Sequence, residues 1–161
     1  MKEKNGEHPF GDTGQLILLG LFLVIWAGDS FLLHQSTFLA DLVPVSIRVI
    51  ILSVCVSAAF YLGRSGHAVV SQDTRPAGVV RTGAFRYIRH PLYLGSLMFY
   101  LGLAISTASL FSLALLVGIF AFYNHIASYE EKLLLARLGD DYRRYMKTTG
   151  KWMPGIGRPD A

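Results

Sequence analysis

The sequence predicts an all-α membrane protein with about four transmembrane helices and a cytoplasmic C-terminal amphipathic helix. Of its 161 residues, 52% are hydrophobic and only 16% are charged, whereas a soluble domain carries about 25% charged residues. Four apolar runs cover residues 15–33, 43–63, 92–106 and 110–127. The first two match the roughly 20 residues that cross the hydrocarbon core of a bilayer. We therefore read residues 1–161 as one integral membrane domain.

The first two runs each contain one charged residue, Asp29 and Arg48. The first run is longer than the core of a signal peptide and follows a segment of mixed charge, so we expect it to remain as a span. Asp29 and Arg48 lie about one turn from the same end of two antiparallel spans. Because a lone charge in a membrane is costly, we expect these two residues to pair directly or through water.

The third run is the shortest, at about 22 Å if helical. Pro91 precedes it and suits the first turn of a helix, where a missing N–H costs nothing. The run crosses the membrane only if Arg89, His90 and Pro91 lie at headgroup depth. Alternatively, it forms one arm of a shallow hairpin that turns at residues 106–109.

The fourth run is expected to continue as a helix beyond the membrane. Apolar and aromatic residues recur there at helical spacing with basic and acidic residues between them, which predicts an amphipathic helix. The recurring residues are Leu133, Leu134, Leu138, Tyr142 and Tyr145. Gly139 is expected to divide this helix into two pieces.

The distribution of basic residues predicts the orientation in the membrane. Every Lys and Arg except Arg48 lies in residues 1–14, 64–91 or 128–161. Four spans place all three segments on one side, which the positive-inside rule assigns to the cytoplasm. We therefore expect both termini to be cytoplasmic and the protein to be integral to the inner, or cytoplasmic, membrane. Nucleic-acid binding is excluded as an explanation of the charge, because no basic helix stands clear of the membrane.

Two polar clusters beside the apolar runs predict a ligand site. The start of the third helix offers free N–H groups, and Arg86 and Arg89 lie near it, a combination suited to a carboxylate or phosphate. Glu130 and Glu131 can accept hydrogen bonds from an ammonium group or from ribose hydroxyls. The residues available to pack against a purine or a sulfonium are Tyr93, Tyr142 and Tyr145. This set suits S-adenosylmethionine, although positive-inside anchors and exposed helix charges explain the same residues equally well.

A resemblance to a known family favours the ligand site. Residues 83–95, which contain Arg89, His90, Pro91, Tyr93 and Gly95, resemble the R-H-P-x-Y-x-G motif of the isoprenylcysteine carboxyl methyltransferase family, whose superfamily includes phospholipid methyltransferases. Residues 129–134 and 138–145 resemble its E-E-x-x-L and F-G-x-x-Y-x-x-Y segments, and residues 151–154 its R-W-x-P ending. Leu138 replaces the usual Phe, and residues 148–150 depart from the usual link.

The resemblance implies methyl transfer from S-adenosylmethionine to a lipophilic acceptor at the cytoplasmic membrane face, with an isoprenylcysteine-like carboxylate as the leading acceptor. It implies catalytic roles for Arg89 and Glu131 and no metal. The cofactor-binding residues that it implies are His90, Pro91, Leu92, Tyr93, Gly95, Glu130, Glu131 and Tyr142. We favour Glu131 over Glu130 because it shares a helix face with Asn124 and Ser128, and Glu131→Gln should weaken cofactor binding without affecting folding.

Several alternatives stay open on the sequence. The protein could be a phospholipid or thiol methyltransferase, an NADPH-dependent membrane reductase, or a non-catalytic membrane scaffold. A soluble-type methyltransferase is excluded, because no glycine-rich nucleotide loop follows a strand. Membrane lipid and a lipophilic or prenylated acceptor are the expected partners. The sequence does not fix the acceptor or the oligomeric state.

Overall fold

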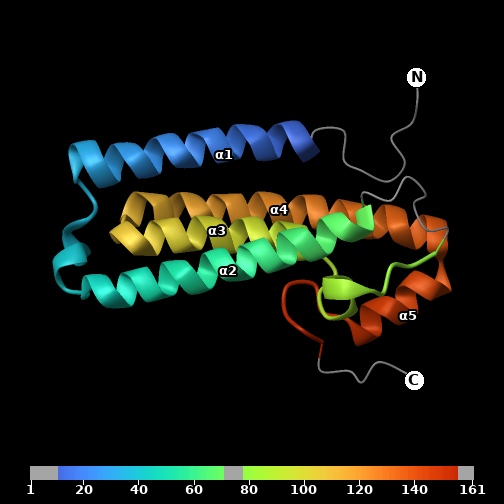
Figure 1. The fold of residues 1–161 in the computed structure, drawn as a ribbon. Coiled ribbons are helices and arrows are strands. Elements are labelled where there is room, and N and C mark those ends of the chain that lie inside the picture. The colour runs from blue at the N-terminus through green and yellow to red at the C-terminus, as the bar shows by residue number, and fades with distance from the viewer. Residues whose placement is uncertain (1–10, 71–77, 156–161) are drawn as a thin grey trace.

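The computed structural model describes residues 11–70 and 78–155, and these form a bundle of helices (Figure 1). The long helices are α1 (Gly11–Ala27), α2 (Val45–Val70), α3 (Pro91–Thr107) and α4 (Leu110–Leu138). Helix α1 continues as the π-helix η1 (Gly28–Leu33), and α4 is followed by α5 (Asp140–Thr148). Two short 3₁₀ helices, η2 (Phe38–Asp41) and η3 (Gly83–Arg86), lie in the connections. The all-α prediction is confirmed for the described residues.

The helix lengths agree with an integral membrane protein. Among the described residues, three segments are long and apolar enough to cross a bilayer: Thr13–Leu33, Val45–His67 and Leu110–Leu138. Helix α3 is a shorter apolar helix of 17 residues, or about 26 Å. Many large apolar side chains on α1 and α2 are exposed, as lipid-facing residues would be.

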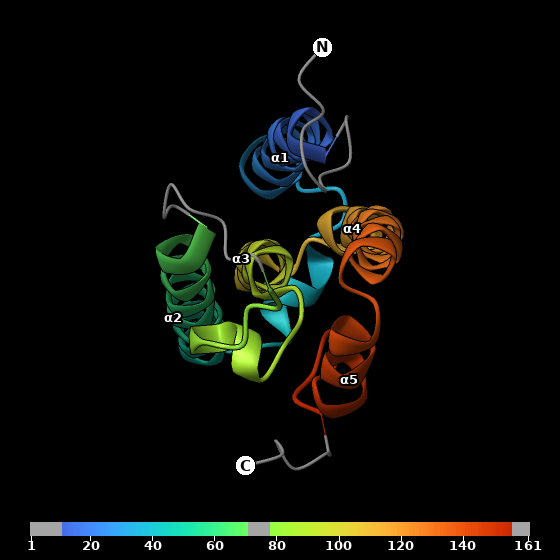
Figure 2. The same cartoon turned by 90° about the vertical axis from the view of Figure 1, so that its right-hand side faces the viewer.

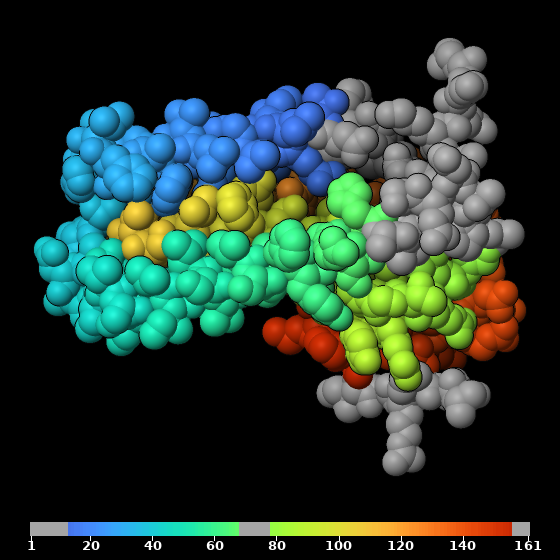
Figure 3. Space-filling model, in the orientation of Figure 1, coloured from blue at the N-terminus to red at the C-terminus, as the bar shows by residue number. Residues whose placement is uncertain are grey.

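Helix α3 is the central helix of the bundle. In the end view it lies between α2 and α4, with α1 on a third side (Figure 2), and in the space-filling view it is visible between α1 and α2 (Figure 3). Small residues bring α3 close to α2, since a Cβ atom added to Gly102 would lie 2.8 Å from the Cβ atom of Cys55. A core cluster of Phe22, Leu97, Tyr100, Ala104, Ile119 and Tyr123 joins α3 to α1 and α4.

Local sequence signals set the ends of these helices. Helix α3 begins at Pro91, as predicted, and α3 and α4 form a hairpin whose turn contains Ala108 in the left-handed region (φ 54°). The hydroxyl of Ser109 accepts a hydrogen bond from the Ser112 backbone N–H and so caps α4. Gly139 (φ 56°) separates α4 from α5, as predicted. The amphipathic character of α5 is also confirmed, because Tyr142 and Tyr145 are buried while its basic residues are exposed.

The predicted direct pairing of Asp29 with Arg48 is wrong. The Asp29 carboxylate accepts hydrogen bonds from the Ser36 backbone N–H (2.9 Å), from the Ser36 hydroxyl (2.5 Å) and from the Ser109 hydroxyl (2.6 Å). Arg48 donates to the backbone oxygens of Val43 (3.2 Å) and Ser106 (2.9 Å). Similar depth was a poor guide, because turns at this end of the bundle supply each charge with its own nearby partners.

Some predictions lie outside the described residues. They include the expected cytoplasmic placement of residues 1–10, which contain Lys2 and Lys4, of residues 71–77, which contain Arg75, and of residues 156–161, which contain Arg158.

Candidate active site

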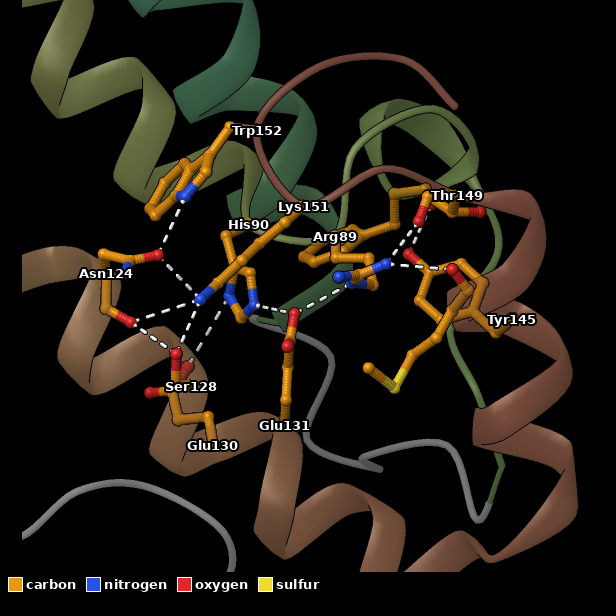
Figure 4. Close-up of polar contacts among 12 residues, drawn as sticks. Arg89, His90, Asn124, Ser128, Glu130, Glu131, Tyr145, Thr149, Lys151 and Trp152 are labelled. Atoms are coloured by element: carbon orange, nitrogen blue, oxygen red, sulfur yellow. Dashed lines mark hydrogen bonds and ion pairs between the residues drawn. The ribbon is translucent and has the colours of Figure 1, made fainter. Parts of the chain in front are cut away.

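The two polar clusters singled out in the sequence lie together at one end of the α3–α4 hairpin. The Arg89 Nε atom donates to Glu131 Oε1 (2.8 Å), and His90 Nε2 lies 3.0 Å from the same oxygen (Figure 4). About forty residues separate these side chains in the sequence, but the hairpin brings the start of α3 beside the last part of α4. We call Arg89, His90, Glu130 and Glu131 the Glu131 cluster.

Arg89 is engaged by the protein on several sides. Besides Glu131, its guanidinium donates to the backbone oxygens of Met146 (3.1 Å) and Thr149 (2.5 Å), and its own backbone N–H donates to the oxygen of Gly150 (2.9 Å). The arginine therefore binds α4 to the residues that follow α5. We call residues 149–152 the C-terminal strap. These contacts favour a role in holding the loop over a role in binding an anion, the two roles open to Arg89.

His90 is buried, and its ring is oriented by both glutamates. Its Nδ1 atom lies 3.8 Å from Glu130 Oε2, opposite the contact between Nε2 and Glu131. Burial holds the pKa of His90 below its usual range, although the hydrogen bond to Glu131 opposes this shift. The imidazole is thus neutral near pH 7, and because a carboxylate only accepts, the Nε2 atom carries the proton and donates to Glu131.

Glu130 lies on the aromatic side of the cluster. The Tyr93 hydroxyl donates to Glu130 Oε1 (2.6 Å). The Tyr93 ring stacks between His90 (centroids 5.7 Å apart, 3° between planes) and Tyr123 (5.3 Å, 24°). The Glu130 side chain is 16% exposed, against 10% for Glu131. Glu130 is therefore the more accessible carboxylate, in contrast to the preference for Glu131 drawn from helix spacing.

The C-terminal strap covers one side of this cluster. Lys151 Nζ donates to Asn124 Oδ1 (2.8 Å), to the Asn124 backbone oxygen (3.2 Å) and to the Ser128 hydroxyl (2.7 Å). The Trp152 ring lies against Phe120 (5.4 Å between centroids) and His90 (6.0 Å), and its Nε1 donates to Asn124 Oδ1 (3.2 Å). Sequence reasoning assigned no role to the Lys151 and Trp152 side chains. The sequence did offer one signal for these contacts, namely that Asn124 and Ser128 lie on the same helix face as Glu131.

The remaining residues expected at the site pack against other parts of the protein. Pro91 is fully buried, and Gly95 and Leu92 face α2, where a Cβ atom on Gly95 would lie 3.2 Å from the Ala59 oxygen. Tyr142 is 3% exposed and packs against Tyr145 (5.7 Å between centroids).

The other aromatic and basic residues near the cluster also have protein partners. The Tyr145 hydroxyl donates to the Phe85 oxygen (2.5 Å), and burial raises the pKa of Tyr145 to about 12. Arg86 is exposed and lies over the ring of its neighbour Tyr87. Tyr145 therefore remains a neutral hydrogen-bond donor. Among the described residues, Arg86 makes no hydrogen bond or ion pair with the Glu131 cluster.

Comparison with known proteins defines the class of this chain. A family model described as phospholipid methyltransferase matches residues 45–141, more than half of the chain. The chain therefore belongs to the phospholipid methyltransferase family of membrane proteins, which confirms the resemblance drawn from the sequence motifs. The matched region contains α2, α3 and α4, and with them every member of the Glu131 cluster.

A particular relative narrows the comparison. The chain is 29% identical over 102 residues to a protein-S-isoprenylcysteine O-methyltransferase of Schizosaccharomyces pombe. The match covers 62% of this chain and 43% of the relative, so the chain spans less than half of that protein's length. No solved structure matches the chain significantly.

Proposed function

We propose that the protein transfers a methyl group from S-adenosylmethionine to a lipophilic acceptor at the cytoplasmic face of the membrane, with an isoprenylcysteine-like carboxylate as the acceptor. The observation that carries this proposal is the junction of the Arg89–Pro91 segment with Glu130 and Glu131 at one end of the α3–α4 hairpin. Membership of a methyltransferase family supports it. The orientation is supported by the basic residues of the loop and tail, which fall on one side of a four-helix arrangement.

The residues present fit the proposed cofactor. S-adenosylmethionine carries an ammonium group, a carboxylate and a sulfonium cation, and when bound it supplies an electrophilic methyl group. Glu130 offers a carboxylate for a cationic group. The stacked rings of His90, Tyr93 and Tyr123 offer faces on which a purine or a cation is stabilised. Glu130 and Tyr93 are therefore proposed to contact the cofactor.

Arg89 and Glu131 are proposed to act by positioning. Their ion pair fixes the end of α4 against the start of α3, and the further contacts of Arg89 fix the C-terminal strap. Methyl transfer requires close, in-line approach of the acceptor and exclusion of water. The C-terminal strap places Trp152 against His90. A strap held there supports both requirements, because it covers one side of the cluster against water and limits the directions from which an acceptor approaches.

The chemistry of the cluster favours a carboxylate acceptor. An amine or thiol must lose a proton to become a nucleophile, so its methylation needs a base. The Nε2 atom of His90 donates to Glu131, Glu131 also pairs with Arg89, and Glu130 is assigned to the cofactor. The remaining basic atom of the cluster is His90 Nδ1, and burial lowers the pKa of His90, which makes it a weak base. A carboxylate attacks without losing a proton, and the methylated acceptor is a neutral ester. The S. pombe relative, a protein-S-isoprenylcysteine O-methyltransferase by name, agrees with this choice.

A methyl-transfer assay tests the proposal. Purified protein in lipid nanodiscs receives S-adenosylmethionine with a labelled methyl group and one of four acceptors: a prenylcysteine, phosphatidylethanolamine, a fatty acid or a thiol. We expect label in the prenylcysteine product, released as methanol by base because it is a methyl ester. Base-stable label on phosphatidylethanolamine would support phospholipid methylation instead, which the family description favours as the second candidate. No transfer to any acceptor would contradict the proposal.

A matched pair of variants ties the activity to the site. Glu130→Gln removes the accessible carboxylate of the cluster, whereas Asp140→Asn removes an exposed carboxylate of α5 whose side chain is 82% exposed. We expect the first variant to lose methyl transfer and the second to retain it. Equal activity of both variants would place the reaction elsewhere.

A further inference from the structure

The ammonium group of Lys151 is held beside the Glu131 cluster by uncharged groups. Its three hydrogen-bond partners are Asn124 Oδ1, the Asn124 backbone oxygen and the Ser128 hydroxyl. Among the residues that the structure describes, three other cations of this region contact carboxylates: Arg89 contacts Glu131, and on α5 Arg143 and Arg144 contact Asp140 and Asp141. Lys151 thus differs from these cations in having no carboxylate within ion-pair distance in the described part of the chain.

Within residues 11–70 and 78–155, this arrangement leaves the positive charge of Lys151 without a contacting anion. Lys151 is half-buried, and burial lowers its pKa, while the charge of Glu131 at longer range opposes this shift. A charge taken out of water is stabilised most by an opposite charge in contact. The electrostatics therefore favour an anion beside Lys151.

One hydrogen bond of Lys151 is weak enough to be exchanged for a bond to a ligand. The contact with the Asn124 backbone oxygen is its longest, at 3.2 Å, and that oxygen already accepts a hydrogen bond from the Ser128 hydroxyl (2.8 Å). An ammonium group has three N–H donors. Two of them can keep the strap on α4 through Asn124 Oδ1 and Ser128, while the third turns to an incoming oxygen.

The position of Lys151 suits a group bound at the cluster. Figure 4 shows its ammonium group between Asn124 and the His90 ring. The next residue, Trp152, packs against His90 on the same side. Glu130, the more accessible carboxylate, approaches the Nδ1 atom of His90, whereas Glu131 contacts the Nε2 atom. Lys151 and Glu130 thus flank His90, and together they suit a ligand that carries both a negative and a positive group.

We propose that Lys151 is the carboxylate-binding residue of this site, in place of Arg89, whose guanidinium is bound to the protein. The inference rests on the proposed function and deepens it. Two sources offer the carboxylate: the methionine part of the cofactor and the cysteine part of a prenylcysteine acceptor. In both cases the carboxylate takes the third N–H of Lys151, and Glu130 faces the ammonium group of the cofactor.

Equilibrium binding to nanodisc-reconstituted protein tests this inference. The first arm compares the Kd of S-adenosylmethionine with that of decarboxylated S-adenosylmethionine. The second arm compares N-acetyl-S-farnesylcysteine with its carboxamide, each in the presence of S-adenosylhomocysteine. We expect the wild-type protein to prefer the carboxylate ligand by about tenfold or more in one arm, as loss of a charge-assisted hydrogen bond implies. The arm in which this preference appears identifies the source of the carboxylate.

Variants separate carboxylate binding from anchoring of the strap. Lys151→Gln keeps a donor for Asn124 and Ser128 but removes the charge, so we expect it to abolish the preference, whereas Lys151→Arg should keep it. Lys151→Met is a second uncharged variant if Lys151→Gln does not fold. Lys147→Met, at an exposed position of α5, is the matched control and should keep the wild-type ratio.

The outcomes separate the two proposals. A strap that merely loosens weakens both ligands of a pair alike and leaves their ratio unchanged, so an unchanged ratio in the uncharged variants would overturn the role of Lys151. Absence of a preference in the wild-type protein would overturn it too. If the wild-type protein bound neither form of the cofactor, the proposed function itself would fail, and this inference with it.

Discussion

The two ends of the helix bundle each bury a carboxylate, but they surround it with different chemistry. At one end, Asp29 is 3% exposed and accepts hydrogen bonds from a backbone N–H and from the hydroxyls of Ser36 and Ser109. At the other end, Glu131 is also buried and is bonded to Arg89 and His90. We call the first group, with Ser112 bonded to Ser109, the Asp29 network.

The comparison distinguishes two kinds of buried carboxylate by the groups that surround them. The Asp29 network uses uncharged donors, and it joins the start of η1 and the loop that follows η1 to the turn between α3 and α4. The Glu131 cluster contains ionisable groups of both signs beside stacked rings, and Lys151 adds a cation without a carboxylate contact in the described part of the chain. The hydrogen bonds of the Asp29 network suit stabilisation of a turn, whereas the mixed charges of the Glu131 cluster suit the ligand that we propose for it.

The largest expected effect comes from breaking the buried ion pair. Arg89→Met leaves the Glu131 carboxylate buried without its cation, and it removes the donors to Met146 and Thr149. We expect the free energy of unfolding in mixed micelles to fall by about 3–5 kcal/mol. The matched control is Arg143→Met, which breaks an ion pair whose side chains are 68% and 82% exposed. It should cost less than about 1 kcal/mol, and equal losses would contradict the structural role given to Arg89.

The next effect is on ligand binding. Glu130→Gln keeps the size of the side chain and removes its charge, so we expect it to weaken S-adenosylmethionine binding by about 1.5–3 kcal/mol, a factor of roughly 10 to 150 in Kd. Its unfolding free energy should stay close to that of the wild-type protein. Glu131→Gln should also lower the free energy of unfolding, because Arg89 loses its charged partner. This revises the expectation from the sequence that Glu131→Gln leaves folding unaffected. Unchanged binding in both variants would make the pair a structural feature only.

The Asp29 network should respond in the opposite way. Asp29→Asn replaces one carboxylate oxygen with an NH₂ group, which then faces either the Ser36 backbone N–H at the Oδ1 position or the Ser36 and Ser109 hydroxyl donors at the Oδ2 position. We expect a loss of about 1–3 kcal/mol in unfolding free energy and no change in the Kd of S-adenosylmethionine. In a double-mutant cycle, Arg48→Gln should add to Asp29→Asn within about 0.5 kcal/mol, because the two charges have separate partners. A large coupling would restore the pair that the sequence predicted.

The smallest effect is on the pH dependence of stability. Burial lowers the pKa of His90 from its usual value of 6.5, so just below pH 6.5 the unfolded chain binds this proton more readily than the folded protein does. The contribution of His90 to stability is therefore complete above about pH 6.5 and falls with decreasing pH, by at most about 1.4 kcal/mol per pH unit.

A comparison of variants isolates this contribution. The groups that face His90 are Glu130, Glu131, Arg89 and Lys151. Thermal unfolding between pH 5 and 8 should show a shallower acid slope for His90→Gln than for the wild-type protein. His125→Gln, at an exposed position of α4, should keep the wild-type slope. A wild-type slope in His90→Gln would contradict the assignment.

Local signals in the sequence predicted much of the fold. Pro91 at the start of α3, the turn at residues 106–109 and the break at Gly139 each depend on the conformation of a few residues, so the sequence is sufficient to find them. The closeness of His90 and Glu131 also followed, because a hairpin of two apolar helices brings its ends together.

Contacts that depend on helix rotation could not be predicted in this way. The pairing of Asp29 with Ser109 joins residues 80 positions apart, and that of Lys151 with Asn124 joins residues 27 positions apart. Depth in the membrane suggested Arg48 as the partner of Asp29 but did not fix which way either side chain points. The contact between Arg89 and Glu131 was not predicted for a similar reason, since the path of the chain after α5 determines where that guanidinium lies.

Equilibrium binding of S-adenosylmethionine and NADPH to the wild-type protein in nanodiscs tests the central claim most directly. The Glu131 cluster is proposed to bind a methyl donor, so the account predicts saturable binding of S-adenosylmethionine. S-adenosylhomocysteine should displace it, and Glu130→Gln should weaken it by about tenfold or more. NADPH should neither bind nor compete. Binding of NADPH without binding of S-adenosylmethionine would contradict the account and indicate a membrane reductase.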